Sequence, residues 1–431
     1  MKPLNIVDLF CGAGGTSTGI LKAADRLGRP VALTAVNHWP TAINTHTLNH
    51  PRVKHLCESV ENLHPLDLAP AGLDLLAASC ECRYHSNARG GGPCNEQSRA
   101  QAWQLVRWAT DVRVNNILME NVREFLNWGP LLTRSIVYKG RRYRKGRPDP
   151  RKRGQTFTAW VNALTQLGYL VEWRLQNAAD YGDATARIRL ILQARLNRPV
   201  AWPDPTHGPG RPLPWHPAAD HIDLSIIGKS LFGKDGKPRL CRNTVERIIA
   251  GLEKFGGSNA RAFIVMLKGT SRGHLRSSAK SIDAPLPTVQ AAGQHLMLCQ
   301  PFIYHITHRG RHASRCHSLQ KPLPTITTAH RGEMALVQPL VLKYYRTGRC
   351  KPLDLPLDSV TTKARFRLIQ CGNTTLGLDI FTRMLLPAEL AACHSFPPQY
   401  EFTGNLADKI CQIGNSVPVE LAAAHAAAIL S

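Results

Sequence analysis

The stretch that decides the fold is Asn5-Ile6-Val7-Asp8-Leu9-Phe10-Cys11-Gly12-Ala13-Gly14-Gly15-Thr16. Its apolar first half predicts a buried strand, and the glycines that follow predict a tight turn into a helix. Glycines at such a turn let the backbone approach a cofactor and present amide N–H groups, although they also occur for packing alone. The G-x-G-x-x-G fingerprint is absent, so this is not the usual dinucleotide-binding turn.

The alternation of apolar runs and amphipathic stretches continues to about residue 195. Strands are expected at Ile6–Phe10, Val31–Val36, Leu73–Ala78, Asn116–Glu120, Leu170–Leu175 and Leu190–Ala194, and helices include Gln97–Val112 and Thr156–Leu167. Strands that alternate with helices predict an α/β fold with a doubly wound, mostly parallel sheet. In such sheets the chemistry gathers at the carboxyl ends of the strands.

The composition of the chain changes after residue 195, where proline becomes frequent and the hydrophobic periodicity weakens. Within residues 281–370 a short motif, Ala284-Pro285-Leu286-Pro287-Thr288-Val289, recurs at Lys321–Thr328 and Leu355–Thr362. Three loose copies predict a small, loop-rich, β-containing domain over residues 196–380. Residues 381–431 regain helical character and are expected to return to the first domain, residues 1–195.

Charge points to a nucleic-acid partner. The 431 residues carry a formal net charge of +24, from 54 basic and 30 acidic side chains, which favours a polyanion. One basic loop holds the predicted DNA-binding residues Arg141, Arg142, Arg144 and Lys145. Side chains of this kind grip phosphates without reading base sequence.

Several classes of protein are disfavoured. No stretch approaches the roughly 18–20 apolar residues of a membrane helix, and the first strand starts almost at the N-terminus, so a cytoplasmic location is expected. Twelve cysteines in such a chain do not indicate a disulfide framework. A zinc site from Cys80, Cys82, His85 and Cys94 is disfavoured because C-x-C is tighter than the usual ligand spacing, so no metal is expected.

A thiol and an acid stand at neighbouring strand ends. Cys80 and Cys82 follow the apolar run that ends at Ala78, and Glu120 closes the next predicted strand of the same sheet. A nucleophilic thiol with a nearby acid is typical of covalent catalysis. The residues alone leave open which cysteine is the nucleophile, and a strand-end glutamate is usually only a solvated carboxylate.

The order of the motifs resembles that of the DNA (cytosine-5) methyltransferase family, in its bacterial and phage forms. Asp8–Gly15 is similar to its AdoMet-binding motif, Cys80–Ser86 to Pro-Pro-Cys-Gln-x-Phe-Ser, Glu120–Val122 to Glu-Asn-Val, Ala179–Arg189 to its arginine motif, Arg383–Pro397 to its ninth motif and Gln412–Pro418 to its tenth. The resemblance implies a Rossmann-like, AdoMet-dependent methyltransferase domain. It also implies that residues 196–380 form the target-recognition domain.

The resemblance assigns the nucleophile and its surroundings. It places Cys82 on the catalytic cysteine and Cys80 on a proline. It implies that Cys82 adds to C6 of a flipped cytosine, Glu120 assists at N3 and the exocyclic amine, and C5 receives the methyl group of S-adenosyl-L-methionine. Arg189 is expected near the cytosine O2, and Arg187 near the nucleophile and the phosphate backbone. The implied cofactor contacts are Asp8, Phe10, Gly12, Gly14, Asn37, His38, Asn415 and Val417.

The resemblance also implies double-stranded DNA as the partner, bound by a monomer. It leaves open a restriction–modification role with a cognate restriction endonuclease, a solitary role and an anti-restriction role. An RNA cytosine methyltransferase is disfavoured, because the family's tRNA-directed relatives have a much smaller recognition region. A catalytically silent DNA-binding protein is disfavoured because Cys82 and Glu120 are both present.

Two departures from the family pattern bear on the cofactor. Asn37 stands where an acid for the ribose hydroxyls is usual, and Arg83 follows Cys82 where glutamine or threonine is usual. Arginine prefers carboxylates and phosphates. Arg83 therefore opens an alternative, transfer of a carboxymethyl group from carboxy-S-adenosyl-L-methionine.

Overall fold

The computed structural model describes residues 2–80, 99–226, 228–231, 239–255, 262–267, 271–291, 294–304, 316–318, 340–343, 349–352, 366–369 and 378–431. Cys82, Arg83 and the repeat copies at 321–328 and 355–362 lie outside these residues. The chain forms two compact units. The first comprises residues 1–216, 288–293 and 390–431, and the second comprises residues 217–287 and 294–389.

The first unit is built on a seven-stranded sheet. Its strand order is β3 (Lys54–Leu56), β2 (Val31–Val36), β1 (Leu4–Leu9), β4 (Leu75–Ala78), β5 (Asn116–Asn121), β10 (Ile188–Leu196) and β8 (Tyr169–Asn177). The first five strands are parallel, and β10 runs antiparallel to both of its neighbours. The predicted α/β fold is therefore confirmed; the short β3 was not predicted.

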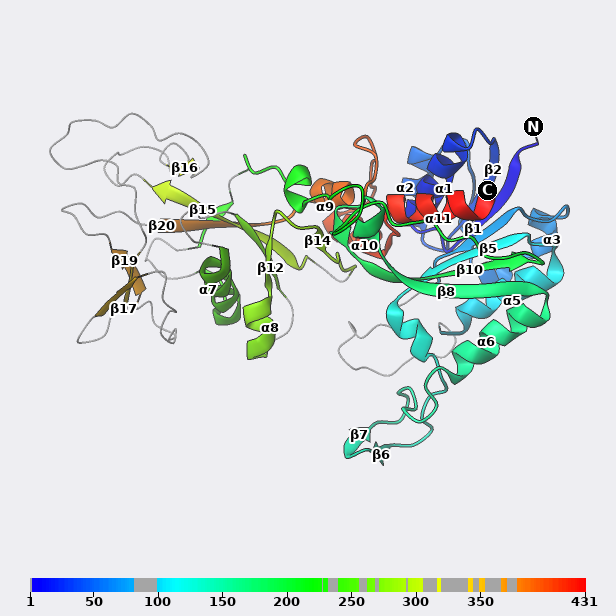
Figure 1. Ribbon diagram of the computed structural model, residues 1–431, viewed down its shortest axis with the longest axis horizontal. Coiled ribbons are helices and arrows are strands. Elements are labelled where there is room, and N and C mark those ends of the chain that lie inside the picture. Colours follow the sequence, from blue (N-terminus) through cyan, green and yellow to red (C-terminus); the bar gives the residue numbers. More distant parts are fainter. Residues whose placement is uncertain are drawn as a thin grey trace. The chain divides into compact units, whose positions relative to one another are not determined.

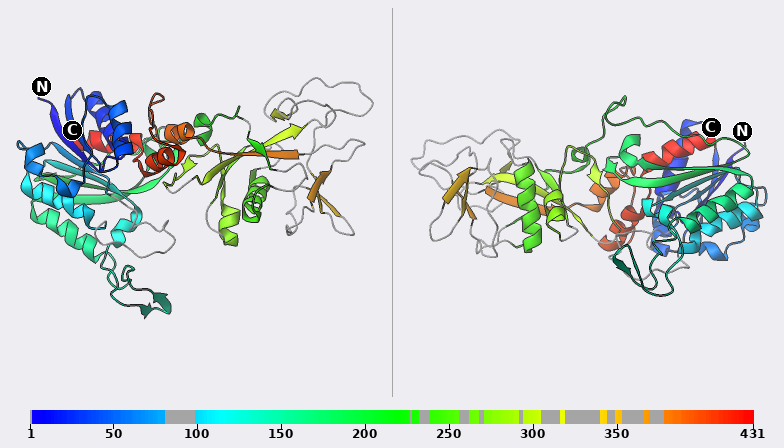
Figure 2. Two further views of the ribbon diagram at one scale, coloured as in Figure 1. Left: turned by 180° about the vertical axis from the view of Figure 1, so that it is seen from behind. Right: turned by 60° about the horizontal axis from the view of Figure 1, so that its bottom comes forward.

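Helices cover both faces of this sheet, as Figures 1 and 2 show. One face carries α1 (Gly15–Arg26) and α11 (Val419–Leu430), and the other carries α5 (Trp103–Asp111) and α6 (Gln155–Gln166). Strands buried on both faces read as continuous apolar runs, which is why β4 is Leu75-Leu76-Ala77-Ala78. Small residues bring α1 and α11 together, since a Cβ on Gly19 would lie 2.6 Å from that of Ala422.

The second unit is built on an antiparallel sheet. Its order is β11 (Lys229–Ser230), β20 (Leu378–Met384), β15 (Leu296–Tyr304), β12 (Phe263–Met266) and β13 (Ala279–Ser281), with β16 (Cys316–Ser318) also paired to β15. Ile248 of α7 (Arg242–Phe255) packs with Phe263 and Cys299 in its core. A separate three-stranded sheet has the order β18 (Arg349–Pro352), β17 (Leu340–Lys343) and β19 (Phe366–Ile369).

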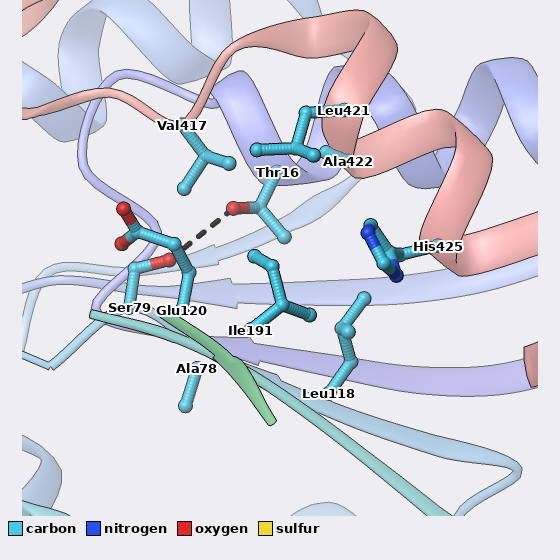
Figure 3. Close-up of a pocket in the computed structure, with 10 residues that line it drawn as sticks. All are labelled: Thr16, Ala78, Ser79, Leu118, Glu120, Ile191, Val417, Leu421, Ala422 and His425. Carbon is cyan, nitrogen blue, oxygen red and sulfur yellow. Dashed lines mark hydrogen bonds between the residues drawn. The ribbon is translucent and has the colours of Figure 1, made fainter. Parts of the chain in front are cut away.

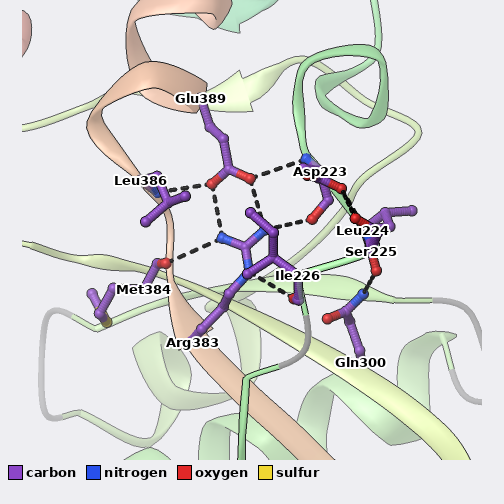
Figure 4. A network of polar contacts seen from close by, with 9 residues as sticks. All are labelled: Asp223, Leu224, Ser225, Ile226, Gln300, Arg383, Met384, Leu386 and Glu389. Atoms are coloured by element: carbon purple, nitrogen blue, oxygen red, sulfur yellow. Dashed lines mark hydrogen bonds and ion pairs between the residues drawn. The ribbon is translucent and has the colours of Figure 1, made fainter. Parts of the chain in front are cut away.

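A buried ion pair holds the end of β20 (Figure 4). Arg383 donates to both carboxylate oxygens of Glu389, at 2.7 and 2.8 Å, and to the carbonyls of Asp223 and Ile226. Glu389 also accepts the backbone N–H groups of Asp223 and Leu386. The two side chains are only 10% and 6% exposed. Arg383 and Glu389 of the predicted ninth motif therefore join the end of β20 to the segment that contains Asp223 and Ile226.

The C-terminal segment Leu406–Leu430 is more apolar than the sequence analysis expected. Leu406–Leu430 is long and apolar enough to cross a membrane, with a mean hydropathy of 1.3 over 18 residues. The prediction that no stretch approaches this was wrong. In the structure the segment contains α10 (Leu406–Asn415) and α11, and 67% of the apolar window is buried. Buried helices in the core of a protein can have the same length and hydropathy as a membrane span. The segment is therefore weak evidence for a membrane.

Candidate active site

The structure brings together two of the predicted catalytic residues at the sheet edge. Glu120 lies near the end of β5 and Arg189 near the start of β10, its antiparallel neighbour. The Nε of Arg189 lies 2.9 Å from Oε1 of Glu120, and the side chains are 12% and 13% exposed. A partly buried pair of this kind holds the carboxylate in one orientation while leaving an edge open to a substrate.

A small cavity lies beside Glu120 (Figure 3). It is lined by Thr16, Ala78, Ser79, Leu118, Glu120, Ile191, Val417, Leu421, Ala422 and His425. The hydroxyl groups of Thr16 and Ser79 are 3.3 Å apart across it. The space left for the centre of a water molecule is about 10 Å³, roughly enough for one water. This cavity is therefore too small for a nucleoside.

Cys80 is a buried thiol. It is 6% exposed, and burial raises its pKa to about 12. Asn121, which the sequence places in the Glu-Asn-Val motif without a role of its own, donates from its side chain to the Cys80 carbonyl at 3.3 Å and accepts the Val122 N–H at 2.8 Å. Asn121 thus joins the end of β5 to the chain that leaves β4 toward Cys82.

The glycine loop after β1 has the open backbone that a cofactor needs. Phe10, Gly12 and Gly14 have φ values of 58°, 53° and 95°. A Cβ on Gly12 would meet no atom within 4 Å, whereas one on Gly15 would lie 2.2 Å from the Val417 carbonyl. One side of the loop is therefore open, while the other packs tightly on the segment before α11. Gly14 caps α1 without a side chain, and the Asp8 carboxylate accepts the backbone N–H of Ser17 in the first turn of this helix.

Asp8 supports this loop from inside. Its side chain is fully buried and accepts the Ser17 hydroxyl at 2.6 Å. Burial raises the pKa of Asp8 to about 7. This geometry favours a role in shaping the loop over direct contact with a cofactor.

Asn37 and His38 directly follow β2, which ends at Val36. Asn37 is half-buried and accepts the Trp39 N–H at 2.9 Å, and His38 is exposed. Backbone bonds join Asn37 to Leu56 and Glu58 of the β3 segment. The exposed Glu58 carboxylate accepts the Ser59 N–H and the Asn62 amide, which lower its pKa. The Glu58 carboxylate, just after β3, is thus the acid that lies next to the neutral Asn37, which follows the neighbouring strand β2.

Arg187 lies deeper than expected. It is 3% exposed and donates to the carbonyls of Val289 and Gly414, both at 3.0 Å. These bonds tie the arginine motif to the 288–293 segment and to α10. Asn415 of the tenth motif is exposed, with its amide 3.5 Å from the Cys411 sulfur.

Asp183 has a role that sequence reasoning missed. It is fully buried and accepts the N–H groups of Glu420 and Leu421, at 3.2 and 2.9 Å, in the first turn of α11. Burial raises the pKa of Asp183 to about 7. No local signal could have indicated this bond, because its partners are 237 and 238 residues away.

The basic loop contains a hairpin. Strands β6 (Ile136–Tyr138) and β7 (Arg141–Tyr143) pair antiparallel. The predicted DNA-binding residues Arg141, Arg142, Arg144 and Lys145 are all exposed.

A comparison with protein families agrees with the motif order. The family model described as C-5 cytosine-specific DNA methylase matches residues 4–134, 149–209 and 309–431, more than half of the chain. The chain belongs to this family of cytosine-specific methylases. Two stretches, 135–148 and 210–308, fall outside the match. The first contains the β6–β7 hairpin, and the second contains much of the second unit.

Individual relatives of this methylase are distant. Type II methyltransferase M.Sau3AI of Staphylococcus aureus is 24% identical over 44% of this chain and 43% of its own length. M.AquIA of Picosynechococcus is 26% identical over 54% of this chain and 84% of its own length. The match therefore spans less than half the length of M.Sau3AI. A Spodoptera frugiperda DNMT2 variant of known structure shares the fold, with a TM-score of 0.52, 14% identity and 97% of each chain covered.

A histidine cluster lies behind the glycine loop of the methylase. His46 of α2 (Pro40–Asn49) bonds to His55 through Nδ1 and Nε2 at 2.8 Å, and His50 bonds to the Thr18 hydroxyl at 2.9 Å. Tyr400 packs on His50 and donates to the Ala13 carbonyl. Burial lowers the pKa of His46 to about 3 and that of His50 to about 4.

Acid is expected to destabilise the first unit through its buried histidines. Their folded pKa values lie below the ordinary 6.5, so each contributes stability that is present above pH 6.5 and is lost as the pH falls. The clearest cases are His46, His50, His394 and His425. Asp8 and Asp183 act in the opposite direction, because their folded pKa values are raised. The four histidines outnumber the two carboxylates, so the net effect is a loss of stability as the pH falls from 6.5 to 5.

Urea unfolding followed by tryptophan fluorescence measures this effect, because all eight tryptophans belong to the first unit. A midpoint that stays constant or rises between pH 6.5 and 5 would contradict the assignment of these histidines as neutral in the folded state.

Proposed function

We propose that this chain is a DNA cytosine C5-methyltransferase with Cys82 as nucleophile. The observation that carries the proposal is the Glu120–Arg189 pair at the sheet edge, beside the strand from which the chain runs on to Cys82. An acid and a guanidinium held 2.9 Å apart can address two adjacent polar atoms of one base. We assign Glu120 to N3 and the exocyclic amine, and Arg189 to O2.

In the proposed reaction, the Cys82 thiolate forms a bond to C6 of a cytosine turned out of the duplex. Glu120 donates a proton to N3, so that the charge of the addition does not build up on the ring. The electron pair then available at C5 would form a bond to the methyl carbon of the donor, while the bond from that carbon to the sulfonium sulfur breaks and its electron pair stays on the sulfur. Loss of the C5 proton to a base such as water restores the C5–C6 double bond. The Cys82 thiolate leaves, and the N3 proton returns to Glu120.

S-adenosyl-L-methionine supplies the electrophilic methyl group in this family. The residues present fit it, because the space over Gly12 is open and the N-cap of α1, Gly14, brings no side chain into that space. We assign Phe10, Gly12 and Gly14 to its binding. Asn37 and His38 lie at the end of the next strand, where a ribose would be held.

Target recognition is assigned to the second unit and the surrounding region, residues 196–380, with residues 381–431 completing the catalytic domain. Action as a monomer on double-stranded DNA in the cytoplasm, alongside a cognate endonuclease, stays a prediction. Arg187 is assigned to positioning, because its guanidinium bonds two backbone carbonyls of the catalytic unit.

The alternative donor depends on Arg83. If this guanidinium pairs with a donor carboxylate, the product would carry a carboxymethyl group on C5. Mass spectrometry of nucleosides after reaction with each donor separates the two products. Unchanged donor preference in Arg83→Gln would refute the alternative.

A covalent trap tests the proposed function. Kilobase duplexes made with 5-fluorocytosine present many target sequences, and the fluorine blocks release of the nucleophile after methyl transfer. The chain is expected to form a denaturation-resistant adduct only when S-adenosyl-L-methionine is present. Cys82→Ser should form none, whereas Cys80→Ala should form it, because the Cys80 thiol is buried and protonated. An adduct with 5-fluorocytosine tRNA alone, or none at all, would overturn the proposal.

A further inference from the structure

The β6–β7 hairpin lies outside the match to the family model. Residues 135–148 form a gap between two segments of the family match, 4–134 and 149–209. The gap coincides with the hairpin, whose paired residues are Ile136 with Tyr143 and Tyr138 with Arg141. Figure 1 shows it standing out from the layer that contains α6. The shared motifs lie in the matched segments, so the charge of the hairpin calls for a separate explanation.

The hairpin is rich in basic residues. Residues 139–147 contain six lysines and arginines, and residues 135–148 contain no acid. The acid that follows in the sequence, Asp149, is paired with Arg151, whose Nη2 lies 2.7 Å away. Arg141, Arg142, Arg144 and Lys145 are exposed, so these four side chains carry positive charge at the surface of the hairpin.

The base of the hairpin is firmly attached. Leu132 and Arg147 join through a backbone bond of 2.8 Å, and Gly146 donates back to Leu132 at 2.8 Å. Asp149 donates its N–H to Pro130 at 2.9 Å. The basic side chains are thus presented on a structured ribbon, which lowers the entropy lost when they bind a partner.

Both faces of the ribbon carry charge. The pairing puts Arg141 on the face of Tyr138 and Arg142 on the opposite face with Val137. Among the described residues of the hairpin, one large aliphatic side chain is mostly exposed: that of Val137, at 72%. A membrane would require a continuous apolar face. A two-stranded ribbon that is basic on both faces instead suits a groove between two phosphate backbones.

We propose that the hairpin of residues 135–148 is an auxiliary duplex-binding element, which grips phosphates independently of base sequence. The inference rests on the proposed function for its partner, double-stranded DNA. It extends that function by assigning a second contact, outside the catalytic edge and the recognition region. The element raises affinity for all duplexes alike and leaves the choice of target sequence to other residues.

Salt dependence of binding tests the element. The full chain is titrated onto a fluorescent 30-base-pair duplex of random sequence between 50 and 300 mM salt. Each phosphate contact contributes about −0.9 to the slope of log affinity against log salt. A variant with Arg141→Gln, Arg142→Gln, Arg144→Gln and Lys145→Gln should have a slope shallower by about 3 to 4.

A matched control removes the same charge elsewhere in the first unit: Arg52→Gln, Lys54→Gln, Arg113→Gln and Arg198→Gln, all exposed. The control should keep a slope within about 1 of the wild type. Equal slopes in the hairpin variant and the wild type, equal losses in both variants, or a hairpin effect on tRNA but not on duplex DNA would each overturn the proposal. Absence of methyl transfer to any DNA by the wild type would instead defeat the proposed function.

Discussion

Glu120→Gln is expected to lower methyl transfer to DNA by about 100- to 10,000-fold, the usual contribution of a positioned acid. Glutamine keeps the shape of the side chain but cannot give a proton to N3, and it loses the ion pair with Arg189 at 2.9 Å. The measurement is transfer of labelled methyl groups from S-adenosyl-L-methionine to mixed-sequence DNA under single-turnover conditions. DNA affinity should change little, since the loss lies in the chemical step.

Glu172→Gln is the control for this experiment. Glu172 lies on β8 of the same sheet and also faces an arginine, Arg174 at 3.8 Å, but its side chain is 52% exposed. It should keep wild-type activity. If Glu120→Gln transferred methyl groups at the wild-type rate, or if the Glu172 control lost as much activity, the assignment of Glu120 as the acid would be wrong.

Glu389→Ala is expected to destabilise the second unit by about 3–5 kcal/mol, because it leaves a buried arginine without its carboxylate. Arg383 is 10% exposed and has both oxygens of Glu389 as partners. The free energy of local opening is measured by hydrogen exchange of the β15 and β20 amides. Tryptophan fluorescence would not report it, since every tryptophan lies in the first unit.

The matched control is Glu246→Ala in α7 of the same unit. Its partner Arg242 lies 2.8 Å away, but the side chains are 62% and 28% exposed, so the loss should be about 0.5 kcal/mol or less apart from helix propensity. Exchange rates in Glu389→Ala that match this control would show that the Arg383–Glu389 pair contributes no more than a surface pair.

The strands of the first unit could be predicted because each is a short apolar run bounded by turn residues. β1, β2, β4, β5, β8 and β10 all overlap their predicted ranges. The three-residue β3, which reads Lys54-His55-Leu56, escaped prediction because it is half-buried and has no apolar run. Motif order was equally informative, since it indicated the family that the comparison later showed.

What the sequence determined by itself was the α/β class, the order of the motifs and the family, because these depend on local periodicity and residue type along the chain. Tertiary structure decided the partners. It paired Glu120 with Arg189, buried Asp8 against Ser17, turned Arg187 toward two backbone carbonyls and set Asp183 under a helix 237 residues away. Such contacts join segments far apart in the chain, so no local pattern records which donor meets which acceptor or how much water reaches them.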